Sequence, residues 1–316
     1  MNENNRQPTI DVLLCTYKRV ELLTQTLKGI EESARQFATV RVIVVDNDIH
    51  ESARVLVESR PISSSMEIVY LTQPLQNISI TRNVALEHAV ADYIALIDDD
   101  EVPTLGWLTS LVSISERYDA DVVFGPVEPK YASDVPQWAR EGRFMTSRAR
   151  HSTGNTIQVR DMRSGNVLLR GQRVYSDRPR FDPELGLSGG EDSEFFSKLH
   201  FAGYKNVWCD EAVVYEWVPA SRGSVKWLTK RMFRIGSVES FNRRRRRQWK
   251  PLAYDLLRGA AFTCIGACLA AIWGISSKHR FVVALQKTAF GLGIFYGAVW
   301  GPYFEYKAPN REEASQ

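Results

Sequence analysis

The sequence has little cysteine and little histidine, and this scarcity excludes two common ways of holding a chain together. Only 4 of the 316 residues are cysteines and 5 are histidines. The cysteines, Cys15, Cys209, Cys264 and Cys268, form no CxxC pair, and no histidine lies at the spacing of a zinc ligand. We therefore expect neither a disulfide framework nor a zinc site of the usual pattern, and a reducing compartment fits the chain.

An apolar run at the N-terminus is also lacking, because residues 1–10 read MNENNRQPTI. A secretory signal peptide contains such a run, of roughly 7–15 residues. We therefore expect the main part of the chain to stay in the cytoplasm.

Net charge is low, at +3, but the basic residues are unevenly distributed along the chain. Consecutive arginines occupy residues 243–247, and Lys226, Lys230 and Arg234 come shortly before them. This asymmetry predicts an anionic partner for the C-terminal third of the chain.

Short apolar runs alternate with longer amphipathic segments over roughly the first 220 residues. The runs predict strands at residues 10–15, 40–45, 67–71, 93–97, 122–124, 166–170 and 213–217. The longer segments predict helices at residues 21–37, 51–58, 81–88, 107–118 and 191–202, and residues 126–156 read as irregular. This alternation predicts an α/β fold with a mostly parallel central sheet and helices on both faces.

The strand at residues 93–97 is followed by three acidic residues, Asp98, Asp99 and Asp100. Ligands bind beyond the carboxyl ends of the strands in such sheets. Three adjacent carboxylates repel one another unless a cation neutralises them, and hard divalent cations prefer carboxylate oxygen. Because strand side chains alternate, Asp98 and Asp100 can face one site. A metal site is one interpretation, and a solvated turn or a helix N-cap is the other.

Other acidic positions also have two interpretations. Asp46 follows the strand at residues 40–45, where it suits a hydrogen bond to a uracil or a ribose, or a turn. Glu191 and Asp192 follow a glycine pair at the start of a predicted helix. A carboxylate there suits a general base if its pKa is raised, or Ser188 or Asp192 is a simple helix N-cap.

The character of the chain changes after Pro219. Residues 222–249 mix basic residues with apolar ones at helical spacing, which predicts a basic interfacial helix or a solvated basic helix. Two apolar segments follow at residues 259–275 and 281–300, with the basic sequence SSKHR between them. A spanning helix needs about 20 apolar residues, so both are borderline. Spanning would translocate SSKHR, which favours a re-entrant or interface-lying hairpin, and a buried helix pair is the alternative.

Six motifs occur in order along residues 9–220. They are CTYKR at 15–19, VVDND at 44–48, TRN at 81–83, LIDDDEVP at 96–103, SGNVLLR at 164–170 and GGEDSEF at 189–195. This ordered set resembles the family 2 glycosyltransferases of the GT-A fold. Within that family the chain is similar to bacterial exopolysaccharide glucosyltransferases that extend a polyprenol-linked oligosaccharide. The resemblance implies a Rossmann-like GT-A catalytic domain at residues 1–220. The residues after it predict a basic amphipathic interfacial helix at 221–250 and a membrane-associated helical hairpin with a polar tail at 251–316.

The resemblance also implies a role for each matching residue. It places at the nucleotide sugar Thr16, Tyr17, Arg19, Asp46, Arg82, Asp98 and Asp99. It makes Asp100 the ligand of a manganese or magnesium ion (Mn²⁺ or Mg²⁺), Asp192 the general base, and Glu191 and Asn166 the acceptor-binding residues. Many relatives carry a histidine after the last core strand, where this chain has Glu216 and Trp217. Of these two, only the glutamate can bind a hard cation.

The implied reaction is transfer of a hexose, with glucose expected, from a UDP-sugar to a hydroxyl of a polyprenol-linked saccharide, with inversion. It belongs to exopolysaccharide or other surface polysaccharide biosynthesis, at the cytoplasmic face of the inner membrane and its anionic surface. No nucleic acid is expected as a partner. Two alternatives stay open: a nucleotidyltransferase, which normally needs a glycine-rich loop that CTYKR does not supply, and a non-catalytic membrane scaffold.

Overall fold

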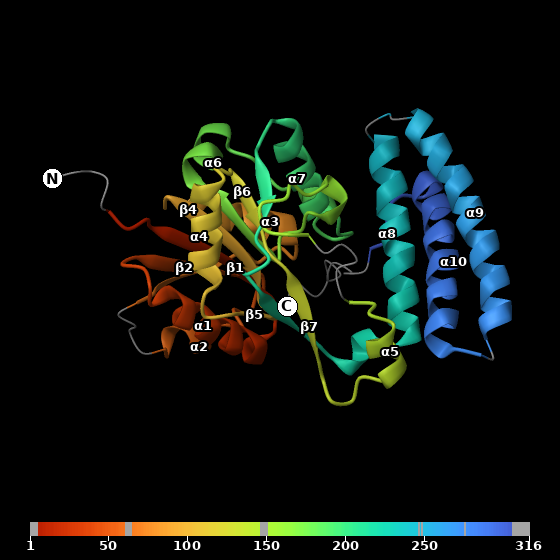
Figure 1. Ribbon diagram of the computed structural model, residues 1–316, viewed down its shortest axis with the longest axis horizontal. Helices are drawn as coiled ribbons and strands as arrows, with labels where there is room; N and C mark the ends of the chain where they lie inside the picture. The colour runs from red at the N-terminus through yellow and green to blue at the C-terminus, as the bar shows by residue number, and fades with distance from the viewer. Residues whose placement is uncertain are drawn as a thin grey trace. The chain divides into compact units, whose positions relative to one another are not determined.

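The computed structural model describes residues 6–60, 65–145, 151–245, 247, 249–274 and 276–304 (Figure 1). The chain forms two compact units. Unit 1 consists of Met1–Pro129, Ser147–Gly186 and Glu191–Trp217, and unit 2 of Lys130–Thr146, Leu187–Gly190 and Val218–Gln316. Parts of the expected basic stretch, apolar hairpin and polar tail, at residues 246, 248, 275 and 305–316, lie outside the described residues.

Unit 1 is built on a seven-stranded sheet with the order β3-β2-β1-β4-β8-β6-β9. Its strands are β1 (Ile10–Thr16), β2 (Val40–Asp46), β3 (Glu67–Thr72), β4 (Tyr93–Asp98), β6 (Val122–Phe124), β8 (Asn166–Arg170) and β9 (Asn206–Trp208). β3, β2, β1 and β4 are parallel to one another, and β9 is parallel to β6. Only β8 runs antiparallel to its neighbours in this sheet. The predicted mostly parallel α/β sheet is confirmed.

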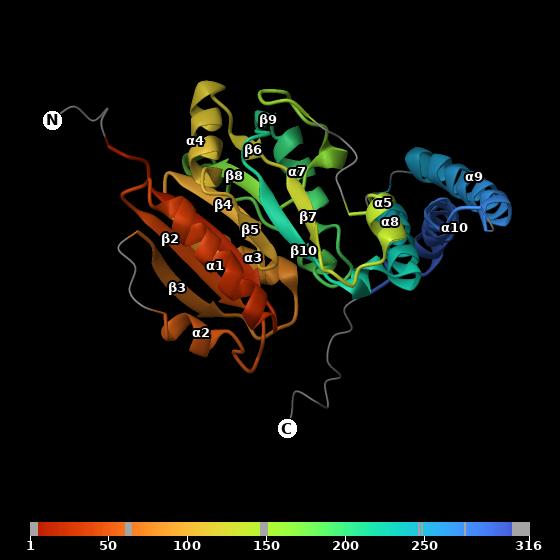
Figure 2. The same ribbon diagram turned by 60° about the horizontal axis from the view of Figure 1, so that its bottom comes forward.

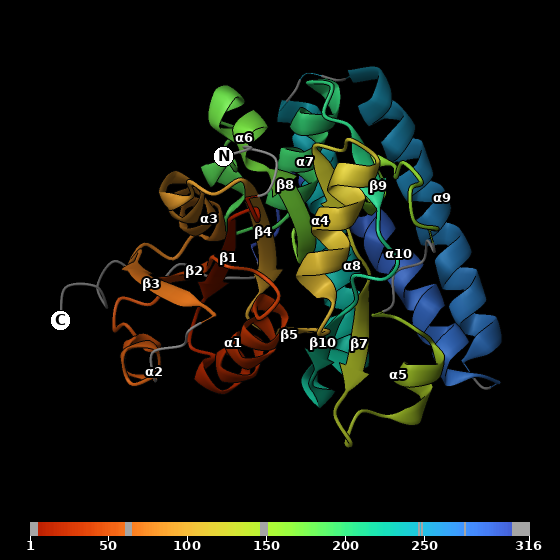
Figure 3. The same ribbon diagram turned by 60° about the vertical axis from the view of Figure 1, so that its left-hand side comes forward.

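Helices cover both faces of this sheet. They are α1 (Val20–Ala34), α2 (Arg54–Glu58), α3 (Ile78–His88), α4 (Trp107–Arg117), α6 (Gly171–Asp177) and α7 (Glu191–Phe201). One core joins Val12 of β1 to α1 and α4, for example through Leu27 and Leu111. Figures 2 and 3 show the ribbons of α1 and α4 beside the sheet. The opposite core joins Leu13 of β1 to α3 and α7, for example through Phe195. Because successive side chains of β1 enter opposite cores, the strand is apolar throughout.

A second sheet of short strands has the order β5-β10-β7. Its strands are β5 (Glu101–Pro103), β10 (Val214–Val218) and β7 (Val127–Tyr131). The prediction that residues 126–156 are irregular is therefore wrong where β7 and the short helix α5 (Gln137–Glu141) lie. β7 reads VEPKY, whose charges and proline are unusual in a strand, so its pairing rather than its composition makes it extended.

Unit 2 consists mainly of three long helices, α8 (Val225–Arg245), α9 (Trp249–Trp273) and α10 (Lys278–Val299). Two stretches are long and apolar enough to cross a membrane by length and composition alone: Leu252–Trp273, with mean hydropathy 1.7, and Lys278–Val299, with mean hydropathy 1.4. α8 carries the basic, amphipathic pattern expected for this region. These helices fit the membrane-associated segment that the sequence predicts.

Candidate active site

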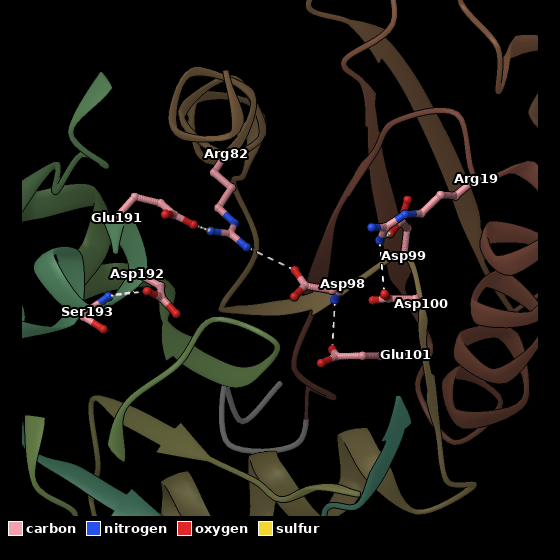
Figure 4. Close-up of polar contacts among 9 residues, drawn as sticks. All are labelled: Arg19, Arg82, Asp98, Asp99, Asp100, Glu101, Glu191, Asp192 and Ser193. Carbon is pink, nitrogen blue, oxygen red and sulfur yellow. Dashed lines mark hydrogen bonds and ion pairs between the residues drawn. The ribbon is translucent and has the colours of Figure 1, made fainter. Parts of the chain in front are cut away.

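Acidic side chains collect at the carboxyl end of the sheet in unit 1. β2 ends at Asp46 and β4 at Asp98, and Asp99 and Asp100 form the turn between β4 and β5. A parallel sheet brings the carboxyl ends of its strands to one edge, where ligands bind in such folds. Figure 4 shows the side chains around this turn, where two arginines are each held between two carboxylates.

Arg19 lies in the loop after β1 and bridges Asp99 and Asp100. Its Nη1 donates to Asp99 Oδ1 at 2.9 Å and to Asp100 Oδ2 at 3.1 Å. The Thr16 hydroxyl donates to the other Asp99 oxygen at 2.8 Å. Both carboxylates are buried, whereas 38% of the Arg19 side chain is exposed. Burial raises the pKa of Asp99 to about 6, although the charge of Arg19 opposes this shift.

Arg82 lies on α3 and bridges Glu191 and Asp98. Its Nη1 donates to Glu191 Oε1 at 2.6 Å, and its Nη2 donates to Asp98 Oδ1 at 3.1 Å. Asn77 caps α3 by accepting from the Ile80 N–H, which fixes the turn that carries the arginine. Burial alone lowers the pKa of Arg82, but the two carboxylates outweigh it and raise the pKa above its ordinary value. The guanidinium therefore stays charged.

Glu191 and Asp192 begin α7. Glu191 forms an ion pair with Arg82, whereas Asp192 forms none with any described residue. Gly189 and Gly190 precede them with φ values of 79° and 92°, which L side chains rarely adopt. Burial raises the pKa of Glu191, although its ion pair opposes the shift. Glu191 Oε2 is buried and has no hydrogen-bond partner in the described part of the chain. Asp192 is half-buried, and its Oδ1 accepts from the Ser193 N–H at 2.6 Å.

Glu101 is a further acidic residue of this site that the sequence motifs did not single out. It is buried at the start of β5, and its Oε2 accepts from the Asp98 N–H at 3.0 Å. A Cβ at Gly165 would lie 2.3 Å from Glu101 Oε1, so the chain before β8 packs directly on this carboxylate. Burial raises the pKa of Glu101, and the charges of Asp98, Asp100 and Glu216 add to the shift. The one signal in the sequence is that Glu101 continues the acidic triplet.

The chemistry of these side chains fits a hard divalent cation. Asp98, Asp100 and Glu216 all act on the charge of Glu101, and carboxylate oxygen is the ligand that Mn²⁺ and Mg²⁺ prefer. Among the residues that the structure describes, no three acidic, histidine or cysteine side chains are already arranged around one metal position. Asp100 Oδ2 instead contacts Arg19, whose guanidinium supplies positive charge at this point. The role of Asp100 as a metal ligand stays a prediction.

The structure pairs Asp98 and Asp100 with different arginines, although strand alternation suggested one shared site for them. The acidic residues that share an arginine are instead Asp99 and Asp100, because β4 ends at Asp98 and the next two residues turn. The turn, rather than strand alternation, therefore decides where Asp100 lies.

Asp46 is fully buried and stabilises the turn after β2. Its Oδ1 accepts from the Asp48 N–H at 3.0 Å, and its Oδ2 accepts from the Ala53 N–H at 2.8 Å and the Tyr70 hydroxyl at 2.9 Å. These contacts are the turn chemistry that competed with nucleotide binding in the sequence. A contact between Asp46 and uracil stays a prediction, as does one between Tyr17, which is 38% exposed, and the nucleotide.

Asn166, the first residue of β8, is only 2% exposed, and the fold uses all of its polar groups. Its amide nitrogen donates to the carbonyls of Pro126 at 2.9 Å and Ala212 at 2.6 Å. Its Oδ1 accepts from Trp107 Nε1 at 2.8 Å. The structure therefore gives Asn166 a role in joining β8 to its surroundings, and its role in acceptor binding stays a prediction.

A small hollow opens beside Arg82, at the carboxyl ends of β1 and β4. It is lined by Leu13, Cys15, Arg82, Leu96, Ile97, Asp98 and Ser164. Burial raises the pKa of the Cys15 thiol to about 12, although Arg82 opposes the shift. Because the thiolate is the reactive form, this shift makes Cys15 a weaker nucleophile at neutral pH.

Comparison with known proteins decides the family. Residues 11–170 match the sequence profile described as Glycosyl transferase family 2. This chain belongs to that family. The succinoglycan biosynthesis protein ExoM of Rhizobium meliloti is 40% identical to this glycosyltransferase over 233 residues, which are 72% of this chain and 73% of that protein. A glucosyl-dolichyl phosphate glucuronosyltransferase of Haloferax volcanii is 28% identical over 185 residues, 57% of this chain and 58% of that protein.

Solved structures confirm the fold of the glycosyltransferase. The crystal structure of S. aureus TarS 1–349 in complex with UDP-GlcNAc has a TM-score of 0.56 at 15% identity, over 95% of this chain and 98% of that one. The same protein in complex with UDP gives a TM-score of 0.55. The family and the GT-A fold predicted from the ordered motifs are both confirmed.

Proposed function

We propose that this glycosyltransferase moves a hexose, with glucose as the expected sugar, from a UDP-sugar to a hydroxyl of a polyprenol-linked saccharide in exopolysaccharide or related surface polysaccharide biosynthesis. The 40% identical relative acts in succinoglycan biosynthesis by its name. A structure with the same fold holds UDP-GlcNAc, which supports the class of donor. A second relative is named for a substrate carried on dolichyl phosphate, which supports a lipid-linked acceptor.

One observation carries the catalytic part of the proposal: Asp192 has no ion pair with any described residue, yet it adjoins the Arg82–Glu191 pair. A carboxylate that no cation neutralises can accept a proton. The neighbouring Glu191 is committed to Arg82 through Oε1, but its buried Oε2 can still accept from a sugar hydroxyl. We therefore assign proton removal to Asp192 and acceptor orientation to Glu191.

The proposed reaction is a single displacement at the anomeric carbon. Asp192 takes the proton of the acceptor hydroxyl as its oxygen attacks the face opposite the UDP, and the bond to the diphosphate breaks. The carboxylate becomes a carboxylic acid and the anomeric configuration inverts. Arg19 and Arg82 supply positive charge near the site, and the more exposed Arg19 can contact the negatively charged donor. Asp100 would hold Mn²⁺ or Mg²⁺, which neutralises charge on the leaving diphosphate when it is bound.

We place the enzyme at the cytoplasmic face of the inner membrane. The apolar helices α9 and α10 and the basic helix α8 support attachment to an anionic membrane. An enzyme held there meets a lipid-linked acceptor at the surface where that acceptor is carried.

Release of UDP from a panel of UDP-sugars, with membranes that contain lipid-linked saccharide, tests the proposal. We expect Asp192→Asn to bind the donor normally but to transfer sugar about 10²–10⁴-fold more slowly. Asp119→Asn is a matched control, because Asp119 is 84% exposed and pairs with Arg170 at the opposite edge of the sheet. Transfer by Asp192→Asn at the wild-type rate would remove Asp192 from the mechanism. Pyrophosphate release from a nucleoside triphosphate would favour a nucleotidyltransferase, and no release would favour a scaffold.

A further inference from the structure

The long helices of unit 2 form a layer in which α10 lies next to both α8 and α9 (Figures 1 and 3). Ser240 Oγ of α8 donates to the Ile294 carbonyl of α10 at 2.7 Å, and Arg244 Nη1 donates to the Ala298 carbonyl at 2.8 Å. The basic residues of α8 include Lys226, Lys230, Arg231, Arg234, Arg243, Arg244 and Arg245. If α10 crossed a bilayer, α8 would bring these charges into the hydrocarbon, which is strongly unfavourable.

α9 packs on α10 with one side and exposes an apolar surface on the other. The rings of Phe262 on α9 and Phe290 on α10 have centroids 5.7 Å apart. Only 11% of the apolar window of α9 is buried, against 44% for α10. Between residues 252 and 273, each exposed side chain belongs to Ala, Cys, Ile, Leu or Tyr. α10 also exposes Leu292, Phe295 and Val299, but the larger share of the exposed apolar surface lies on α9.

The first turns of α9 carry an ion-pair network that shortens its apolar part. Arg258 Nη2 lies 2.7 Å from Glu239 of α8 and 3.1 Å from Asp255 of α9, and Arg243 also contacts Asp255. The stretch of α9 without charge then runs from residue 259 to residue 273, which is about 22 Å of helix at 1.5 Å per residue. The hydrocarbon core of a bilayer is about 30 Å thick, so this stretch is too short to cross it upright.

Exposed basic residues flank α9 at both ends. Arg247 and Lys250 lie at its start, and Lys278 and Arg280 follow its end. If α9 crossed the membrane, one of these pairs would be translocated, which the positive-inside rule disfavours. A helix that lies in the membrane plane keeps both pairs at the same layer of headgroups, where anionic lipids attract them.

We propose that unit 2 binds one leaflet of an anionic phospholipid membrane through α9, which lies in the plane of the interface with its exposed face among the acyl chains. α10 stays within the protein, and neither helix crosses. This inference rests on the membrane attachment in the proposed function and adds its geometry. It is independent of the transfer chemistry in unit 1.

Labelling from opposite sides of the membrane tests the geometry. Ala253 and Ser276 lie near the two ends of α9, and both are exposed. Ala253→Cys and Ser276→Cys are introduced one at a time into the full chain, with both cysteines of α9 replaced by serine. We expect a membrane-impermeant maleimide to label both sites in inside-out vesicles and neither in spheroplasts. Labelling of the two sites from opposite sides would overturn the proposal.

A fluorophore attached to the native cysteines of α9 reports how deeply the helix lies in the membrane, and no residue has to be substituted. Cys264 and Cys268 are exposed, whereas Cys15 and Cys209 have thiols whose pKa burial raises to about 12, so a thiol-reactive fluorophore labels α9 selectively. In vesicles, we expect lipids with a quencher near the headgroup to quench this fluorophore more than lipids with a quencher at the chain end. Stronger quenching from the chain end would indicate a spanning helix, and no quenching would exclude contact with lipid. Either result overturns the proposal.

The flanking charges are tested by binding to vesicles that contain phosphatidylglycerol. We expect Lys250→Gln and Arg280→Gln each to weaken binding about five-fold. Lys205→Gln removes an exposed charge from unit 1 and is expected to bind like the wild type. Wild-type binding by the first two variants would overturn the contact with headgroups. UDP release by the wild-type protein is measured in parallel. If the protein binds lipid but releases no UDP from any UDP-sugar, the proposed function fails while the placement of α9 stands.

Discussion

Two arginines in unit 1 each hold a pair of carboxylates, but their surroundings differ. Arg82 is 10% exposed and joins α3, the end of β4 and the start of α7. Arg19 is 38% exposed and joins its loop to one turn. Removing Arg82 leaves the buried Glu191 without a cation, whereas water reaches the partly exposed guanidinium of Arg19 and can replace part of its contact with the buried Asp99 and Asp100. We infer that Arg82 is a fixed part of the fold, and that Arg19 can give way to a ligand.

The largest expected effect comes from breaking the buried bridge. Arg82→Met keeps an apolar side chain near the ring of Phe181, which the guanidinium covers at 5.4 Å, but removes the charge. Because Glu191 is then buried without a cation, we expect the free energy of unfolding to fall by about 3–5 kcal/mol. Urea unfolding of the purified full-length protein in mild detergent measures this loss.

Arg180→Met is the matched control for the buried bridge. Arg180 pairs with Glu87 at 3.0 Å, and both side chains are about half exposed, at 46% and 51%. An exposed pair of this kind contributes about 1 kcal/mol at most, so this variant should stay close to the wild type. If Arg82→Met and Arg180→Met lose the same amount, the distinction between a fixed and an exchangeable arginine does not hold.

We expect a smaller loss in the free energy of unfolding when the contact that holds the backbone of Asp98, a partner of Arg82, is disturbed. Glu101 holds the Asp98 N–H, and Gly165 leaves room for the Glu101 carboxylate. The added methyl group of Gly165→Ala would displace that carboxylate, and overpacking of this kind costs about 1–3 kcal/mol. Gly106→Ala is the control, since the nearest atom to its added Cβ is 3.8 Å away. Equal stabilities for the two variants, measured by urea unfolding, would show that Glu101 is not held in place.

The parts of the fold that could be predicted are those that local pattern decides. β1, β2 and β4 are continuous apolar runs because both faces of the sheet are covered, so their positions follow from composition. β5 and β7 are short and carry charged residues, and they are extended because each is paired in the sheet with β10, far along the chain. Pairing over such separations leaves no periodic signal in either segment.

The candidate site divides in the same way. Acidic residues at the carboxyl ends of β2 and β4 follow from the position of the strands, so Asp46 and the acidic triplet were predictable. The contact of Arg82 with Glu191 joins residues 109 positions apart, and no motif encodes that distance. Asn166 lay in a motif, but its hydrogen bonds to distant carbonyls show that it serves the fold.

The smallest expected effect concerns the exposed arginine. Arg19 Nη1 contacts Asp100 Oδ2, so the guanidinium competes with any metal ion at that oxygen. We expect Arg19→Gln to bind Mn²⁺ about five-fold more tightly in the absence of donor, because water reaches the 38% exposed Arg19 side chain and screens its pair with the buried Asp100 to about 1 kcal/mol. Lys18→Gln is the control, because it removes the same charge from the same loop but pairs with Asp48 instead. Calorimetric titration that finds equal Mn²⁺ affinity in Arg19→Gln and the wild type would mean that Arg19 is not exchangeable.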